Sequence, residues 1–122
     1  MIMDELLEFA DATALDTSGT NSDLIGDVID LGSVTSDIGN GQPIYLVLRV
    51  NDAVTSAGAA TVVFTLASDA QAAIAVDGTQ TTHFSTAAIP LSGLTANSQQ
   101  IMVALPVDTY ERYLGIVTTT GT

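Results

Sequence analysis

The chain has 122 residues and a formal net charge of −12, with fourteen acidic side chains, two arginines, and neither cysteine nor lysine. Such an acidic chain has almost nothing with which to neutralise phosphates, which excludes partnership with nucleic acids and with anionic membrane surfaces. The lack of cysteine excludes disulfides and thiolate chemistry, and an apolar fraction of 47% is enough for the core of one folded domain.

The N-terminal third carries most of the charge, because nine of the fourteen acids lie at or before Asp37. We interpret residues 1–41 as an acidic arm with loops, and residues 42–122 as the strand-rich body of the same single domain. Residues 4–10 predict a short helix with acids in its first turn, where they suit the helix dipole. The alternative for these residues is a docked strand. The start lacks the basic residues of a secretory signal, so we expect the protein to be made and used without Sec export.

The segment between the arm and the body is rich in turn-forming residues. Residues 16–23 and 32–41 predict loops, the second containing the turn-prone pair Asn40-Gly41. Between them, residues 27–31 predict a short strand.

Five segments of the body alternate apolar and polar side chains with the two-residue period of a strand. In the clearest, Leu46, Leu48 and Val50 fall on one face while Tyr45 and Arg49 fall on the other. We read residues 68–75 as a loop or a single helical turn. Short strands separated by turns predict an all-β fold, a jelly-roll-like antiparallel sandwich. The five predicted strands are residues 44–50, 60–67, 81–89, 99–105 and 110–118.

Few residues suggest a catalytic or metal-binding site. His83 is the sole histidine, and a catalytic triad would need Ser85 or Ser92 as nucleophile together with a buried carboxylate. No Gly-x-Ser-x-Gly motif accompanies these serines, so we interpret His83 as a structural or surface histidine. Asp30, with Asp37 and Asn40, offers oxygen ligands for calcium, but such residues commonly form turns. We therefore expect no catalytic, cofactor-binding or metal-binding residues, and no enzyme.

The two arginines are candidates for contacts. Arg49 interrupts an apolar strand, and Arg112 precedes another. A buried arginine requires an acidic partner, within the subunit or in a neighbouring one. A solvent-facing position on the strand is the open alternative for both.

Ordered stretches along almost the whole chain resemble a family of phage capsid cement, or decoration, proteins typified by the Bordetella phage BPP-1 cement protein. No single stretch is chemically specific, so the resemblance depends on their order and spacing. That family continues with a further strand after the last stretch, whereas this sequence ends at Thr122. The stretches are MIMDELLEFADA (1–12), VIDLG (28–32), DIGNGQPIYL (37–46), AGAATV (57–62), LASD (66–69), ERYL (111–114) and TTTGT (118–122).

The resemblance implies a jelly-roll protein that forms homotrimers and clamps neighbouring major capsid proteins on the outer surface of the virion, where it stabilises the shell. It brings no catalytic residue. The alternative is a carbohydrate-binding β-sandwich module on a virion or cell surface, which the polar loops favour and the few aromatic residues oppose. As candidate residues for subunit or capsid contacts we take Ile2, Leu6, Leu7, Phe9, Arg49 and Arg112.

Overall fold

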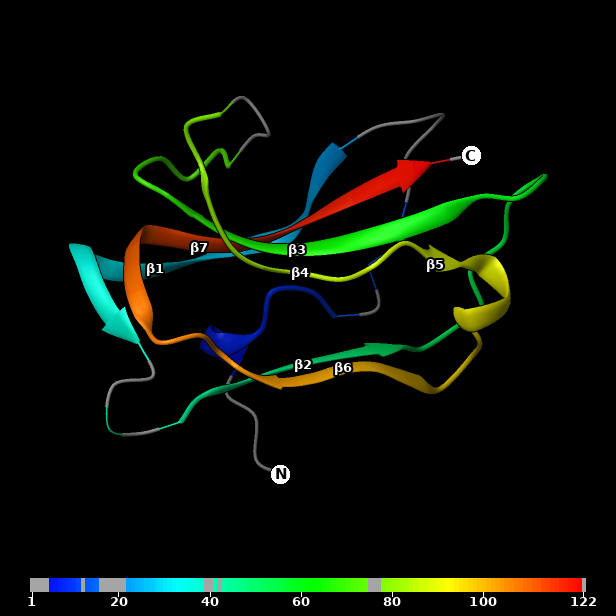
Figure 1. Ribbon diagram of the computed structural model, residues 1–122, viewed down its shortest axis with the longest axis horizontal. Coiled ribbons are helices and arrows are strands. Elements are labelled where there is room, and N and C mark those ends of the chain that lie inside the picture. The colour runs from blue at the N-terminus through cyan, green and yellow to red at the C-terminus, as the bar shows by residue number, and fades with distance from the viewer. Residues whose placement is uncertain are drawn as a thin grey trace.

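The computed structural model describes residues 5–11, 13–15, 22–38, 41, 43–74 and 78–121. Its strands form two antiparallel sheets packed face to face (Figure 1). The predicted all-β sandwich is confirmed. In the described residues, no helix is long and apolar enough to cross a membrane.

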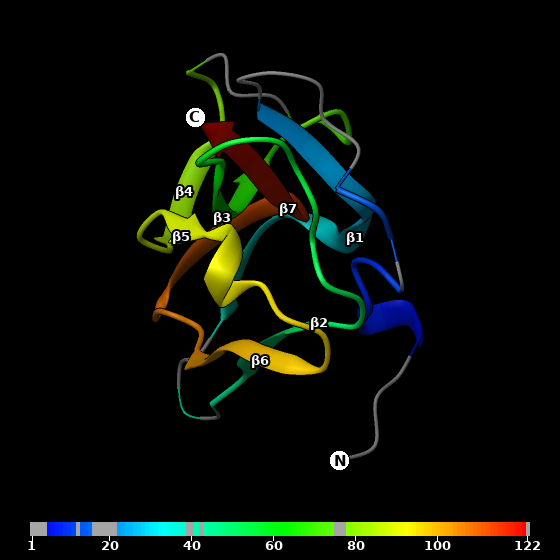
Figure 2. The same cartoon turned by 90° about the vertical axis from the view of Figure 1, so that its right-hand side faces the viewer.

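The large sheet has the strand order β1-β7-β3-β4, with the short β5 paired to β3, and the small sheet contains β2 and β6. Figure 2 shows the two layers from the side, the large sheet above the small one. Two short 3-10 helices complete the described elements. The bounds are η1 Glu5–Leu7, β1 Ser22–Ile38, β2 Tyr45–Val50, β3 Thr61–Asp69, β4 Thr81–Ser85, β5 Ile89–Pro90, η2 Leu91–Gly93, β6 Ser98–Ala104 and β7 Asp108–Gly121.

The main core lies between the sheets. Alternation along β3 turns Phe64 and Leu66 inward, and alternation along β2 and β6 turns Leu46 and Ile101 to meet them. Burying one such side chain contributes about 1.5–3 kcal/mol. This one cluster therefore holds the two layers together.

A second, smaller cluster covers the outer face of the large sheet. Ala67 of β3 and Val117 of β7 are buried there beneath Ile74, which comes from the loop after β3. Leu24 and Val28 of β1 pack against the same cluster. The large sheet thus has apolar packing on both of its faces, on the outer one only around this cluster.

The prediction for the N-terminal third was wrong in one respect. β1 is a 17-residue strand along β7, where the sequence predicted a short strand between loops. Its register shifts between Ile25 and Ile29 and again between Asp30 and Thr35. Such bulges interrupt the two-residue alternation on which a strand prediction depends.

Glycine is required at one of these irregularities. Gly26 has a φ of +67°, and a Cβ atom there would collide with the carbonyl oxygen of Phe9. The next residue, Asp27, donates its backbone N–H to that same oxygen at 2.7 Å. The close approach attaches the N-terminal segment to β1.

The other predictions differ in detail. The predicted helix over residues 4–10 is only the 3-10 turn η1 in the described part. The predicted strand over residues 81–89 divides into β4 and β5. β3 extends to Asp69, so Ser68 belongs to a strand and not to the predicted loop. The other predicted body strands agree with β2, β6 and β7 to within a few residues.

Candidate functional site

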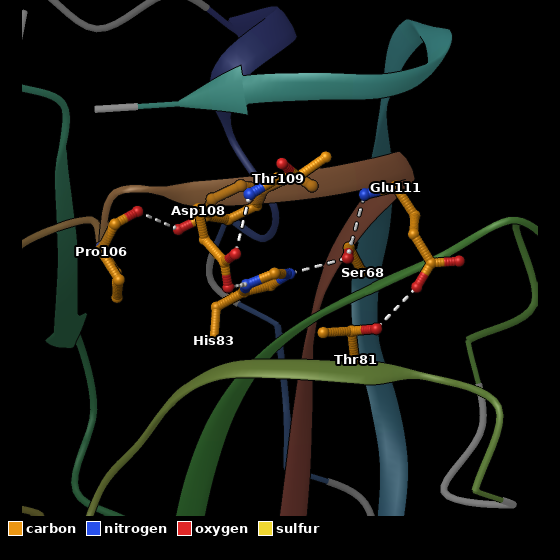
Figure 3. A network of polar contacts seen from close by, with 8 residues as sticks. Ser68, Thr81, His83, Pro106, Asp108, Thr109 and Glu111 are labelled. Atoms are coloured by element: carbon orange, nitrogen blue, oxygen red, sulfur yellow. Dashed lines mark hydrogen bonds and ion pairs between the residues drawn. The ribbon is translucent and has the colours of Figure 1, made fainter. Parts of the chain in front are cut away.

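A polar network lies at one end of the large sheet and joins Ser68 of β3, His83 of β4 and Asp108 of β7 (Figure 3). The pairing of β3 with β4 explains how it forms. Leu66 pairs with Phe84 and Ala67 pairs with Thr82, so His83 is the extra residue of a bulge. A bulge changes the direction of a side chain, and here the imidazole points toward Ser68 and Asp108.

Both imidazole nitrogens have partners. Nε2 lies 2.7 Å from the Ser68 Oγ, and Nδ1 lies 3.2 Å from the Asp108 Oδ2. The Ser68 Oγ also accepts the backbone N–H of Glu111 at 3.2 Å, which leaves its own hydrogen to donate to Nε2. With hydrogen on Nδ1, the imidazole donates to the Asp108 carboxylate, and each bond has one donor and one acceptor.

Aromatic stacking and burial complete the network. The His83 ring stacks on Tyr110, with centroids 3.8 Å apart and an interplanar angle of 15°. The hydroxyl of Tyr110 donates to the carbonyl of Pro106 at 2.8 Å. Burial raises the pKa of Tyr110, and the nearby Asp108 carboxylate raises it further. The phenol therefore stays a neutral donor.

Ser68, His83 and Asp108 are hydrogen-bonded in the order of a hydrolase triad, but the serine is not accessible to a substrate. A nucleophilic serine must be reached by its substrate, whereas Ser68 and the His83 side chain are each 0% exposed. Neither residue lines the hollow over Thr82 and Ser85 on the outer face of the large sheet. The geometry suits a structural connection, because His83 links β4 to β7 across the intervening β3.

The serines considered in the sequence lie elsewhere. Ser85 is exposed on β4, where its hydroxyl contacts that of Thr65, and Ser92 lies in η2. Ser68 was missed because its segment was predicted as a loop. Extending the alternation of β3 by two residues would have placed Ser68 in the strand and close to His83.

The calcium hypothesis finds no support around Asp30. Its carboxylate receives two bonds of 2.9 Å from Arg112, and the backbone N–H of Gly32 at 2.8 Å. The bond from Arg112 is the largest cause that lowers the pKa of Asp30 to about 2, followed by the bond from Gly32. Asn40 lies outside the described residues, as does the Asp37 side chain. Within the described part, no three histidine or acidic side chains gather around a possible metal position.

The six predicted contact residues are spread over the molecule. Leu6 and Leu7 are exposed in η1, whereas Phe9 packs against the main core. Arg112, in the large sheet, pairs with Asp30 and lies over the ring of Tyr113, 5.1 Å from its centroid. The remaining two are Arg49, exposed on β2 of the small sheet, and Ile2, which lies outside the described residues.

The outer surface of the small sheet presents apolar side chains to solvent. Tyr45 of β2 is 57% exposed and Met102 of β6 is 58% exposed. Val47 pairs with Met102, and Tyr45 pairs with Ala104, so these four residues share one face. Arg49 follows on the same side of β2. We call this surface the small-sheet face and define it as Tyr45, Val47, Arg49, Met102 and Ala104.

The three tyrosines bear on the carbohydrate-binding alternative. Tyr110 is buried, Tyr113 lies under Arg112, and Tyr45 is the exposed one. Sugar sites generally use aromatic rings as platforms that face solvent. A single exposed tyrosine gives that alternative little support.

Comparison with known proteins identifies the family of the chain. The sequence model of the Bbp16 family matches residues 9–122, which is almost the whole chain. No curated protein matches the chain.

Proposed function

Because the chain belongs to the Bbp16 family, a family of phage proteins of the Bordetella phage BPP-1 type, we propose that it is a cement protein of a phage capsid. In this role it forms homotrimers on the outer surface of the virion and clamps neighbouring major capsid proteins. The family match over residues 9–122 is the observation that carries the proposal.

The described surface fits a role in binding and not in catalysis. In the one triad-like group of the described residues, Ser68 and His83 are buried and hydrogen-bonded, while apolar side chains stand exposed on the small sheet. A shell protein acts through contact area repeated by symmetry, and several modest sites on one trimer add to a strong attachment. We therefore propose a structural protein without enzymatic activity.

The charge fits the outside of a particle filled with DNA. A formal charge of −12 repels nucleic acid during assembly. The protein would be made in the host cytoplasm and would join the shell through contacts with protein alone. Membranes and nucleic acids are not partners in this proposal.

The test is binding of the purified chain to capsids of its own phage assembled without it. We expect a trimer in sedimentation or light-scattering measurements, saturable binding to the shells, and a higher temperature of shell disruption when the protein is bound. Shells already saturated with the protein serve as the control and should bind no more. A stable monomer with no affinity for the shells would contradict the proposal.

A further inference from the structure

The small-sheet face exposes large apolar side chains, whereas the exposed part of the large sheet's outer face carries polar ones such as Thr82 and Ser85. The large sheet has a core on one face and the Ala67–Ile74–Val117 cluster on the other. The small sheet has the core on one face, while Tyr45 and Met102 on the other stand more than half exposed. Two further apolar side chains next to its strands are exposed as well, Ile44 before β2 and Val107 after β6. Exposed apolar side chains gathered on one surface are typical of a contact surface.

Charge separates this surface from the remainder of the protein. The small-sheet face includes no acid, although the chain has fourteen. Its one charged member is Arg49, and Arg49 forms no ion pair with the described residues. The other arginine, Arg112, is neutralised by Asp30 through two hydrogen bonds. Arg49 is thus the cation that remains for an outside partner.

On the basis of the proposed function, we propose that the small-sheet face is the surface that docks on the major capsid protein, at a site with apolar side chains around a carboxylate. Tyr45 and Met102 would lie against the apolar part, and Arg49 would pair with the carboxylate. Aromatic residues, methionine and arginine are the types enriched at protein interfaces. Arginine suits the pairing because its planar group binds a carboxylate through two bonds.

Charge favours the capsid protein over a second copy as the occupant. If two copies met through this face about a twofold axis, both Arg49 side chains would enter an interface without an acid. A capsid site with an exposed carboxylate satisfies Arg49 without that cost.

The size of the face indicates how strongly one subunit binds. Six residues at about 3.3 Å per residue and two strands about 4.8 Å apart give a surface of roughly 20 by 10 Å. Stable complexes bury about 800 Å² on each partner, several times more. One subunit should therefore bind the capsid weakly, and the trimer should bind it tightly because three faces bind at once.

Substitutions on the small-sheet face test whether it docks on the capsid protein. Tyr45→Thr and Met102→Thr keep a residue that suits a strand, and the double variant should lower the affinity for shells at least about tenfold. Val63→Thr, on the outer face of the large sheet, also replaces an apolar side chain with threonine but lies away from the small-sheet face, and it should bind like the wild type. Arg49→Gln and Thr82→Glu each make the net charge more negative by one. The first should weaken binding, the second should not, and Arg49→Lys should retain part of the affinity.

Melting temperature and oligomeric state are measured for each variant beside binding. Trimeric, folded variants with reduced binding would support the proposal. Equal binding by wild type and face variants would overturn it and leave the cement function standing. Variants that become monomeric would overturn it in favour of a second copy as the occupant. If the wild type itself failed to bind shells, both proposals would fall.

Discussion

The two sheets differ in what their outer faces expose. The large sheet has Leu66 in the main core and Ala67, the next residue, in the outer cluster, and the exposed part of its outer face carries polar side chains such as Thr82 and Ser85. The small sheet has one face on the core, and its other face carries the exposed Tyr45 and Met102. Large apolar residues thus have different roles. Leu66 stabilises the fold, whereas Tyr45 and Met102 are available to a partner.

The largest expected effect is on the free energy of unfolding, and it distinguishes a core residue from a residue on the small-sheet face. Leu66 is 1% exposed, so Leu66→Ala should lower the free energy of unfolding by about 2–5 kcal/mol through lost burial and a cavity. Met102→Ala removes a side chain of similar size from the small-sheet face and should cost less than about 1 kcal/mol. Urea unfolding of both variants measures the difference. Equal losses would show that the small-sheet face is buried in the folded protein.

A second prediction concerns the buried network of the large sheet. Ser68→Ala removes the acceptor of the Glu111 N–H and the partner of His83, so it should cost about 1–3 kcal/mol. Ser85→Ala, on the exposed side of the same sheet, is the matched control and should stay within about 0.5 kcal/mol. Urea unfolding again provides the measurement. An equal cost for the two serines would argue against a structural role for the network.

The smallest expected effect is at the surface of the large sheet, where Arg112 holds the pKa of Asp30 at about 2, below its ordinary value of 3.8. A pKa lowered by folding stabilises the protein above the unfolded value, and this stabilisation is lost as the pH falls. Wild type should therefore melt above Asp30→Asn at pH 7, with the gap closing between about pH 4 and pH 2. Both groups are exposed, so the gap at pH 7 should be small.

Thermal melting of both proteins across that pH range provides the measurement. Thr82→Asn, a change at an exposed strand position of the same sheet, is the control and should show no such pH dependence. A gap between wild type and Asp30→Asn that stayed constant from pH 7 to pH 2 would contradict the assignment.

The sequence predicted those strands whose alternation runs without interruption. Leu46, Leu48 and Val50 alternate with polar or exposed residues, and β2 forms where that pattern predicts it. β1 was not predicted as one long strand because it pairs with β7 through two register shifts, which interrupt the regular pairing of the strand. Bulges of this kind depend on the partner strand, which a local pattern does not contain.

The sequence did not predict the network around His83, for a related reason. Its members come from three strands, and His83 turns inward only because its own strand bulges against β3. Sequence reasoning interpreted His83 as a structural or surface histidine, and the structure buries its side chain. The sequence offered no register with which to select Ser68. The predicted contact residues are placed by the structure, and their roles stay predictions until binding is measured.

The close approach of Phe9 to Gly26 limits which substitutions the protein can accept while it stays folded. Position 26 has both a positive φ and a carbonyl where a Cβ would lie, so no other residue fits while the N-terminal segment stays in place. Gly32, on the same strand and with a φ of +74°, faces open space. Asparagine, which tolerates that backbone conformation, is acceptable there. Random mutagenesis followed by selection for folded protein should therefore leave position 26 fixed and allow position 32 to vary.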